Sequence, residues 1–161
     1  MKVLFVTLVL AGPDGGMLQQ LRLKAEVQGV AACVHFTGFP RGRNTVAAIR
    51  AARLLAIPSR REAMSIVVLE AGVCGRPVLF TDVCGLEEIS RAGAGTMVAV
   101  SVEAVADGLL ATLTDEPAMR RSATRLHALV HERFLWRIQA ERYKGLCEQL
   151  LASRASLGSS V

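Results

Sequence analysis

The sequence is poor in aromatic and acidic residues, and its cysteines follow no metal-binding pattern. Phe, Trp and Tyr together make up 4% of the 161 residues. The four cysteines (Cys33, Cys74, Cys84 and Cys147) form no CxxC pair and have no histidine at metal-ligand spacing. Most of them lie in apolar segments, so we expect reduced cysteines in a cytosolic protein, with neither a disulfide set nor a metal site.

Apolar residues make up 52% of the chain and charged residues 20%, which is typical of a folded globular protein. With few aromatics, the core must consist of Val, Leu, Ile and Ala, as in parallel sheets covered by helices. The formal net charge is +5, and 16 of the 19 basic residues are arginine. Arginine suits phosphorylated ligands and nucleic acid alike. Because the arginines form no block and no aromatics are interleaved with them, we expect a phosphorylated ligand and no nucleic acid.

The first residues admit two interpretations. A lysine followed by the apolar run Val3–Leu10 has the outline of a signal peptide. No A-x-A cleavage site follows, however, and the loop Gly12–Gly16 is typical of the end of a buried strand. The run is also too short to span a bilayer. We therefore predict a strand here and a cytoplasmic location.

Short apolar runs alternate with amphipathic stretches along most of the chain. This alternation predicts an α/β fold, in which a parallel sheet carries helices on both faces and helices alone follow Ser101. Such sheets bind ligands where loops leave the carboxyl ends of the strands. We expect strands at 3–11, 33–36, 54–57, 78–80 and 96–100. We expect helices at 17–27, 45–52, 64–74, 87–90, 102–113, 117–130 and 133–151. Together these elements form one domain at 1–152, followed by a flexible tail at 153–161.

Two carboxylates stand in the otherwise apolar stretch REAMSIVVLEAG. Glu62 should lie in a loop just before a helix that begins near Met64, at the carboxyl edge of the sheet. The free N–H groups of Met64, Ser65 and Ile66 would then form an anion site. Alternatively, Glu62 only complements the helix dipole, and Ser59 caps the helix. From spacing alone the second interpretation is favoured.

Glu70 lies among apolar residues of the same helix, where an unpaired buried carboxylate is costly. Two explanations stay open. The carboxylate could pair with Arg76 or Arg91, which would be a structural role. It could instead face the ligand crevice and accept hydrogen bonds from two hydroxyls of a sugar ring. The residues alone leave these two explanations close to even.

The stretch EAMSIVVLEAGVCGRPVLFTDVCGLEEI, at residues 62–89, resembles the E-x7-E region of the retaining nucleotide-sugar glycosyltransferases of family 4. These are the group 1 transferases with the GT-B fold. Five further stretches resemble motifs of the same family and occur in the family's order and with its spacing: LVLAGPDGG (8–16), VHFTGF (34–39), IPSRREA (57–63), AGAGTMV (92–98) and ERFLW (132–136). The resemblance covers nearly the whole chain. It implies that the predicted α/β fold is the Rossmann-like second half of a GT-B enzyme.

The resemblance also implies roles for individual residues. Glu70 would bind the ribose hydroxyls of the nucleotide, and Glu62 would be the catalytic residue beside the donor sugar. Glu88 matches a later acidic position with a structural or sugar-adjacent role. The donor sugar or diphosphate would contact Arg61 and the amides of Met64, Ser65 and Ile66, and the nucleotide would contact Thr37, Gly38, Phe39 and Arg41, with Arg43 as an alternative.

The implied reaction is transfer of a sugar, with retention, from a nucleoside diphosphate sugar to an acceptor. Backbone dipoles and cationic side chains would stabilise the departing diphosphate without a bound metal, and no cofactor is expected. The family enzymes carry an acceptor-binding N-terminal domain and a first strand and helix with an Arg and a Lys, none of which match here. We expect a separate chain to supply the acceptor domain, and Arg60, Arg61 or Arg43 to replace the cations.

The chain departs from the family pattern at several positions. Ala63 and Met64 stand where Gly and Phe are usual, Arg53 stands where an acidic residue is usual, and Cys84 replaces a glycine. Three functions follow: the donor domain of a glycosyltransferase, a nucleotide-sugar binding module without transfer activity, or a scaffold that kept only the fold. Peripheral contact with the inner face of a membrane is compatible with the first, although a charged, solvated exterior explains the last helix better.

Overall fold

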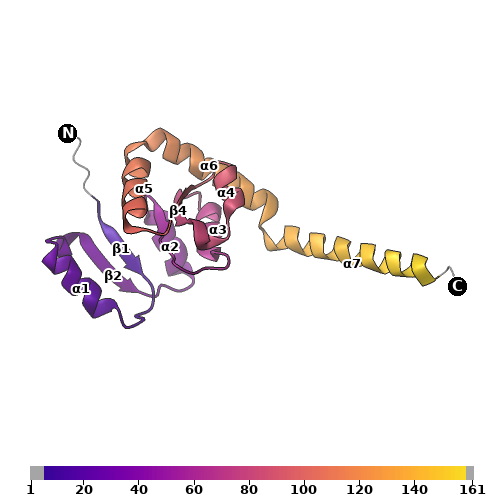
Figure 1. Cartoon of the computed structure of the whole chain (residues 1–161), viewed down its shortest axis with the longest axis horizontal. Helices are drawn as coiled ribbons and strands as arrows, with labels where there is room; N and C mark the ends of the chain where they lie inside the picture. The colour runs from indigo at the N-terminus through magenta and orange to yellow at the C-terminus, as the bar shows by residue number, and fades with distance from the viewer. Residues whose placement is uncertain (1–5, 159–161) are drawn as a thin grey trace. The chain divides into compact units, whose positions relative to one another are not determined.

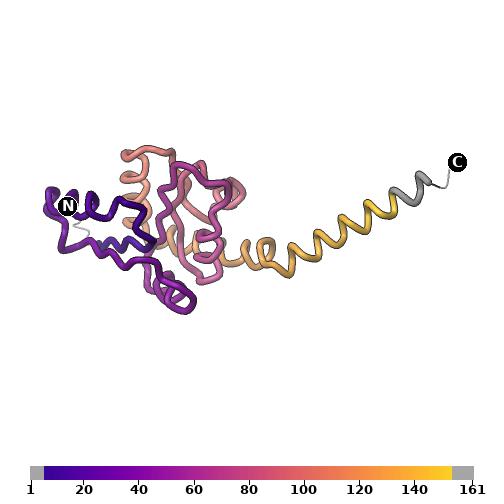
Figure 2. The backbone as a smooth tube through the Cα atoms, turned by 90° about the horizontal axis from the view of Figure 1, so that it is seen from below, coloured from indigo at the N-terminus to yellow at the C-terminus, as the bar shows by residue number. Residues whose placement is uncertain are grey.

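The computed structural model describes residues 6–158 (Figures 1 and 2). Their contacts group into two compact units, of which the first ends at Ala51 and the second begins at Ala52. Each unit has its own small parallel sheet.

The first unit contains strands β1 (Leu8–Ala11) and β2 (Val34–Gly38), paired in parallel with Leu8 opposite Val34. Figure 1 shows helix α1 (Leu18–Val27) alongside these strands. The helix follows a loop in which Asp14 Oδ1 accepts hydrogen bonds from the amides of Gly16 (2.8 Å) and Leu18 (3.2 Å). Because this carboxylate satisfies an N–H at the helix start, it helps to fix where the helix begins. The helical elements are α1 (Leu18–Val27), the 3-10 helix η1 (Ala31–Cys33) and α2 (Arg43–Ala51).

The second unit is built on three parallel strands in the order β3–β4–β5. The central strand, β4, is buried along its whole length. The strands are β3 (Leu55–Ile57), β4 (Val78–Thr81) and β5 (Thr96–Val98), and the helices are α3 (Ile66–Val73), η2 (Asp82–Cys84), α4 (Glu87–Arg91), α5 (Val102–Thr114), α6 (Glu116–Arg133) and α7 (Trp136–Gly158).

Two glycines allow helices of the second unit to pack closely. A Cβ atom on Gly72 of α3 would lie 2.7 Å from Val130 Cγ2 and 3.0 Å from Leu126 Cγ, both on α6. A Cβ on Gly108 of α5 would lie 2.6 Å from Val98 Cγ1 on β5. These partners are stiff or branch-point atoms, so neither glycine has room for a side chain.

The predicted alternation of parallel strands with helices is confirmed, and each expected element is present among the described residues. The strands differ from the prediction in forming two sheets and not one. Helix α3 begins at Ile66 and not near Met64. Helix α7 continues to Gly158, through residues that we expected to form the tail. The start of the first predicted strand, Val3–Phe5, lies outside the described residues.

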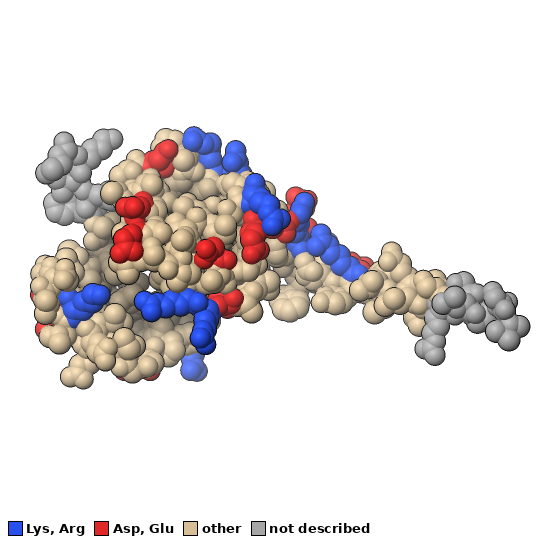
Figure 3. Space-filling view, in the orientation of Figure 1, with Lys and Arg blue, Asp and Glu red and all other residues tan. Residues whose placement is uncertain are grey.

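Helix α7 exposes both charged and aromatic side chains. Arg137, Arg142 and Lys144 are exposed, and basic side chains are visible along α6 and the beginning of α7 in Figure 3. Trp136 and Tyr143 keep 88% and 69% of their surface exposed. Within residues 6–158, none of the helices has the length and hydropathy that crossing a membrane requires.

Candidate functional site

Two loops meet at the carboxyl edge of the β3–β4–β5 sheet. One joins β3 to α3, and the other follows β4. The Ser65 amide donates to the Cys84 carbonyl (3.2 Å), and Thr81 Oγ1 donates to the Ser59 carbonyl (2.6 Å). Gly85 has a φ of 66°, and the Ala63 carbonyl lies where a Cβ of residue 85 would be. The β4–α4 loop therefore fixes the backbone of the loop that carries Glu62.

Glu70 is exposed, although its neighbours in the sequence are apolar. It lies on an outward-facing stripe of α3 together with Ile66 (61% exposed) and Val67 (43% exposed). Among the described residues it forms no ion pair with Arg76 or Arg91, so the structural explanation for this carboxylate is wrong. The buried face of α3 is formed instead by Val68, Ala71 and Gly72.

The amides at the start of α3 are only partly available to a ligand. The prediction that the Ser65 amide is free is wrong, because this amide donates to Cys84. The amides of Met64 and Ile66 have no hydrogen-bond acceptor within the described part of the chain. The N-cap position of α3 is held by Ser65, whose side chain makes no capping hydrogen bond. The alternative in which Ser59 caps this helix is therefore wrong. Two of the three predicted amides are thus left without an acceptor among the described residues.

The charged side chains of the preceding loop face solvent. Arg60, Arg61 and Glu62 are all exposed, and within residues 6–158 none of them forms an ion pair. Their charges are therefore not consumed by internal contacts. Glu62 lies in the loop at the carboxyl edge of the sheet, Ser65 is the N-cap residue at the start of α3, and Glu70 lies four residues after the first residue of that helix.

The remaining predicted residues lie at the end of β2, in the first unit. Thr37 Oγ1 donates to the Leu10 carbonyl (3.5 Å), and the Gly38 carbonyl accepts from the Gly12 amide (2.8 Å). The Arg41 guanidinium carbon lies 5.8 Å from the centre of the Phe39 ring, and that ring is 61% exposed. A cavity of about 230 Å³ opens at the carboxyl ends of β1 and β2, lined by residues that include Asp14, Arg22, Phe36 and Gly38.

Glu88 forms an ion pair with Arg133 at the end of α6, which ties α4 to α6. Both side chains are close to half exposed, 43% and 46%, so the pair contributes little to stability. Of the two roles expected for Glu88, the structural one agrees with this contact.

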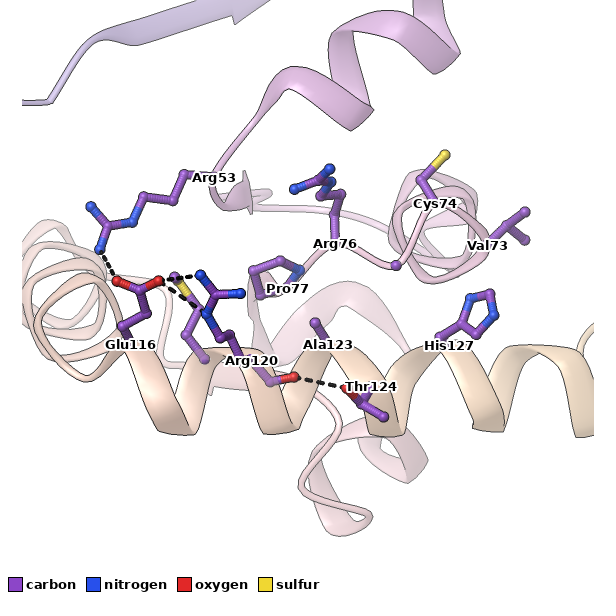
Figure 4. Close-up of a pocket in the computed structure, with 12 residues that line it drawn as sticks. Arg53, Val73, Cys74, Arg76, Pro77, Glu116, Arg120, Ala123, Thr124 and His127 are labelled. Carbon is purple, nitrogen blue, oxygen red and sulfur yellow. Dashed lines mark hydrogen bonds and ion pairs between the residues drawn. The ribbon is translucent and has the colours of Figure 1, made fainter.

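A charged cavity at the opposite edge of the same sheet was not anticipated. It holds about 850 Å³ and is lined by residues that include Arg53, Arg76, Glu116 and Arg120 (Figure 4). A hydrogen bond from Arg120, together with the positive charges of Arg120 and Arg53, lowers the pKa of Glu116 from its ordinary value. The sequence signal was present in the arginines directly before two strands, Arg53 and Arg76. Without the sheet, nothing indicated that they meet.

Comparison with known proteins places the chain in a family. The model of the family described as glycosyl transferases group 1 matches residues 5–126. The D-inositol 3-phosphate glycosyltransferase of Nocardia farcinica is 34% identical over 163 residues, which cover 94% of this chain and 36% of that protein. The lipopolysaccharide glucosyltransferase WaaG of Escherichia coli is 43% identical over 97 residues, which cover 58% of this chain and 25% of WaaG. The chain spans about a third of the length of the Nocardia relative.

Solved structures give the same result for the fold. The crystal structure of WaaG matches with a TM-score of 0.71 and 34% identity, over 84% of this chain and 36% of WaaG. Anabaena HepE in complex with UDP-glucose matches with a TM-score of 0.76 over 89% of this chain and 41% of that one, at an identity of 22% that shows the fold alone. The architecture is that of the C-terminal half of GT-B glycosyltransferases. With its sequence and its fold in agreement, the chain belongs to the group 1 glycosyl transferases.

Proposed function

We propose that this chain is the donor-binding domain of a retaining glycosyltransferase and that it binds a nucleoside diphosphate sugar at the carboxyl edge of the β3–β4–β5 sheet. The observation that carries the proposal is the state of Glu70: an exposed carboxylate in a mostly apolar helix, without an ion-pair partner in the described residues. Such a carboxylate is free to accept hydrogen bonds from the two hydroxyls of a ribose.

The start of α3 supplies the complementary element for the diphosphate. The unpaired amides of Met64 and Ile66 stand at the positive end of the helix dipole. Negative charge grows on the diphosphate as the glycosidic bond breaks, so preorganised donors here stabilise the transition state more than the ground state. Arg60 and Arg61, exposed in the loop just before, supply cationic side chains for the same charge.

Glu62 is the proposed catalytic residue. It is exposed three residues before the N-cap of α3, and the contact between Gly85 and the Ala63 carbonyl holds the backbone next to it. A carboxylate held there would lie near the donor sugar once the diphosphate binds at the helix start. In the first unit, Thr37, Gly38, Phe39 and Arg41 stay predicted nucleotide contacts, and there the Arg41 guanidinium carbon lies 5.8 Å from the centre of the exposed Phe39 ring.

Binding is tested by calorimetric titration of the whole chain with UDP-glucose, the ligand named in the matching HepE structure. We expect saturable binding that weakens about 10- to 100-fold in Glu70→Gln, the range for loss of hydrogen bonds to a charged group. The control is Glu148→Gln, which removes the same charge from an exposed position on α7. Equal affinities in the two variants would refute the role of Glu70.

A second candidate function is nucleotide-sugar binding without transfer. It is favoured by Ala63, whose side chain stands where the family pattern has a glycine. Turnover of UDP-glucose separates the two candidates, with the chain alone and with an added acceptor-domain chain. Transfer that is lost in Glu62→Gln, with donor binding retained, supports the enzyme. Donor binding without any turnover in either mixture supports the binding module.

A further inference from the structure

The second unit carries a concentration of positive charge at the amino edge of its sheet, away from the proposed donor site. Arg53 lies two residues before β3, and Arg76 lies two residues before β4. Because β3 and β4 are parallel, both residues lie at the edge opposite to the loop that carries Glu62 and leads into α3. Arg120 comes from α6 and faces the same cavity of about 850 Å³ (Figure 4).

The cavity holds more positive than negative charge. Its lining includes three arginines and one carboxylate, Glu116. Arg120 donates from Nε (3.0 Å) and Nη2 (2.6 Å) to Glu116 Oε1, and Arg53 Nη2 lies 3.5 Å from Oε2. Each oxygen of this carboxylate thus already contacts an arginine, and Arg76 forms no ion pair among the described residues.

Arg76 is the side chain without a partner. Its Nε is buried and has no hydrogen-bond acceptor among the described residues. In Figure 4 its guanidinium points away from Pro77 and α6, with no dashed line to any residue drawn. A buried donor without an acceptor is costly, so an acceptor from outside the chain is expected here.

Several carbonyl acceptors next to the cavity are already used. The carbonyls of Glu70, Ala71 and Gly72, which precede the lining residues of α3, accept from the amides of Cys74, Arg76 and Gly75 respectively. His127 Nδ1 lies 2.9 Å from the Gly72 carbonyl, so Nδ1 carries the proton and donates to it. The lining of the cavity thus has more cationic donors than carboxylate acceptors, which is the chemistry of an anion site.

We propose that this cavity binds a small phosphate-bearing anion, with Arg76 as the main contact and Arg53 and Arg120 as flanking charges. The guanidinium fork matches the geometry of phosphate oxygens. The site is separate from the donor site, because the two lie at opposite edges of one sheet. It does not depend on the proposed function.

The test uses the whole chain and inorganic phosphate as the probe. The Nε–H signal of Arg76 is followed by ¹H–¹⁵N correlation NMR, and affinity is measured by calorimetry. We expect a saturable shift of this signal, and binding that is about tenfold weaker in Arg76→Gln and Arg120→Gln. Arg121→Gln is the matched control, since Arg121 is exposed on the same helix and does not line the cavity. It should bind phosphate as the unaltered chain does.

Further measurements separate this site from the donor site and from a lipid source. UDP-glucose should not displace the phosphate, and Glu70→Gln should leave phosphate binding unchanged. Sedimentation with vesicles of phosphatidic acid, compared with phosphatidylcholine, shows whether a lipid headgroup enters the same site in an Arg76-dependent way. If Arg76→Gln does not fold, as judged by its melting curve, Arg120→Gln carries the test. A shift that does not saturate, equal affinities in the cavity variants and Arg121→Gln, or displacement by UDP-glucose overturns the proposal.

Discussion

Gly85 controls the loop that carries Glu62, and its replacement by alanine tests this link. Gly85 and Gly75 have nearly the same backbone conformation, with φ values of 66° and 65°. Their surroundings differ. A Cβ at position 75 would meet no atom within 4 Å, whereas a Cβ at position 85 would collide with the Ala63 carbonyl. Gly75→Ala therefore measures the backbone penalty alone, and Gly85→Ala measures the penalty plus the collision.

The expected magnitudes follow from these contacts. A left-handed conformation costs an alanine about 1 kcal/mol, which applies to both variants. In Gly85→Ala the loop around Ala63 must also move, which strains the packing by about 1–3 kcal/mol and breaks the Ser65–Cys84 hydrogen bond at about 1 kcal/mol. Gly85→Ala should therefore be about 2–4 kcal/mol less stable than Gly75→Ala.

Urea unfolding of the two variants measures this difference directly, since equal slopes make the midpoints comparable. In parallel, the affinity for UDP-glucose should fall in Gly85→Ala and stay near that of the unaltered chain in Gly75→Ala. Equal stability of the two variants would refute the reasoning, because the close approach of the Ala63 carbonyl would then cost nothing.

Two further predictions concern the packing and the charges of the second unit. Gly72→Ala should destabilise the chain by about 1–2 kcal/mol, since overpacking against Val130 exceeds the gain in helix propensity. In a double-mutant cycle measured by urea unfolding, Val130→Ala should recover part of this loss. If the effects of the two substitutions simply add, the contact between residues 72 and 130 is contradicted. The pKa of Glu116 is lowered from 4.5 by Arg120, so its stabilising effect is complete above the unfolded-state pKa and is lost as pH falls through the lower folded-state pKa. On acidification below about pH 4.5, the melting temperature of Glu116→Gln should therefore fall less than that of the unaltered chain. An equal fall in the two proteins would contradict this.

The elements of the fold could be predicted because their signals are local. The apolar run Val78–Phe80 is bounded by Gly75–Pro77 and Asp82–Gly85, and it became the central strand. Helix α3 begins at Ile66, later than predicted. The Ser65 amide just before it donates to the carbonyl of Cys84, a residue 19 positions further along the chain. A contact of that range has no local sequence signal.

The alternative of a buried, paired Glu70 was suggested by its apolar neighbours. Val67 and Ile66 are apolar but exposed, so a hydrophobic sequence context did not imply burial. The period of the helix places Glu70 with these exposed residues, and Val68 and Ala71 with the core. The cavity lined by Arg53, Arg76 and Arg120 was missed for a related reason. Arg53 and Arg76 line the same cavity because β3 and β4 are neighbours in the sheet.

The central claim is that the carboxylate of Glu70 holds the sugar of a nucleotide. A crystal structure of the chain grown with UDP tests it most directly. The account predicts that both ribose hydroxyls donate to the Glu70 carboxylate and that the diphosphate lies against the amides of Met64 and Ile66. A nucleotide bound elsewhere on the chain, with the Glu70 carboxylate still in contact with solvent alone, would contradict it.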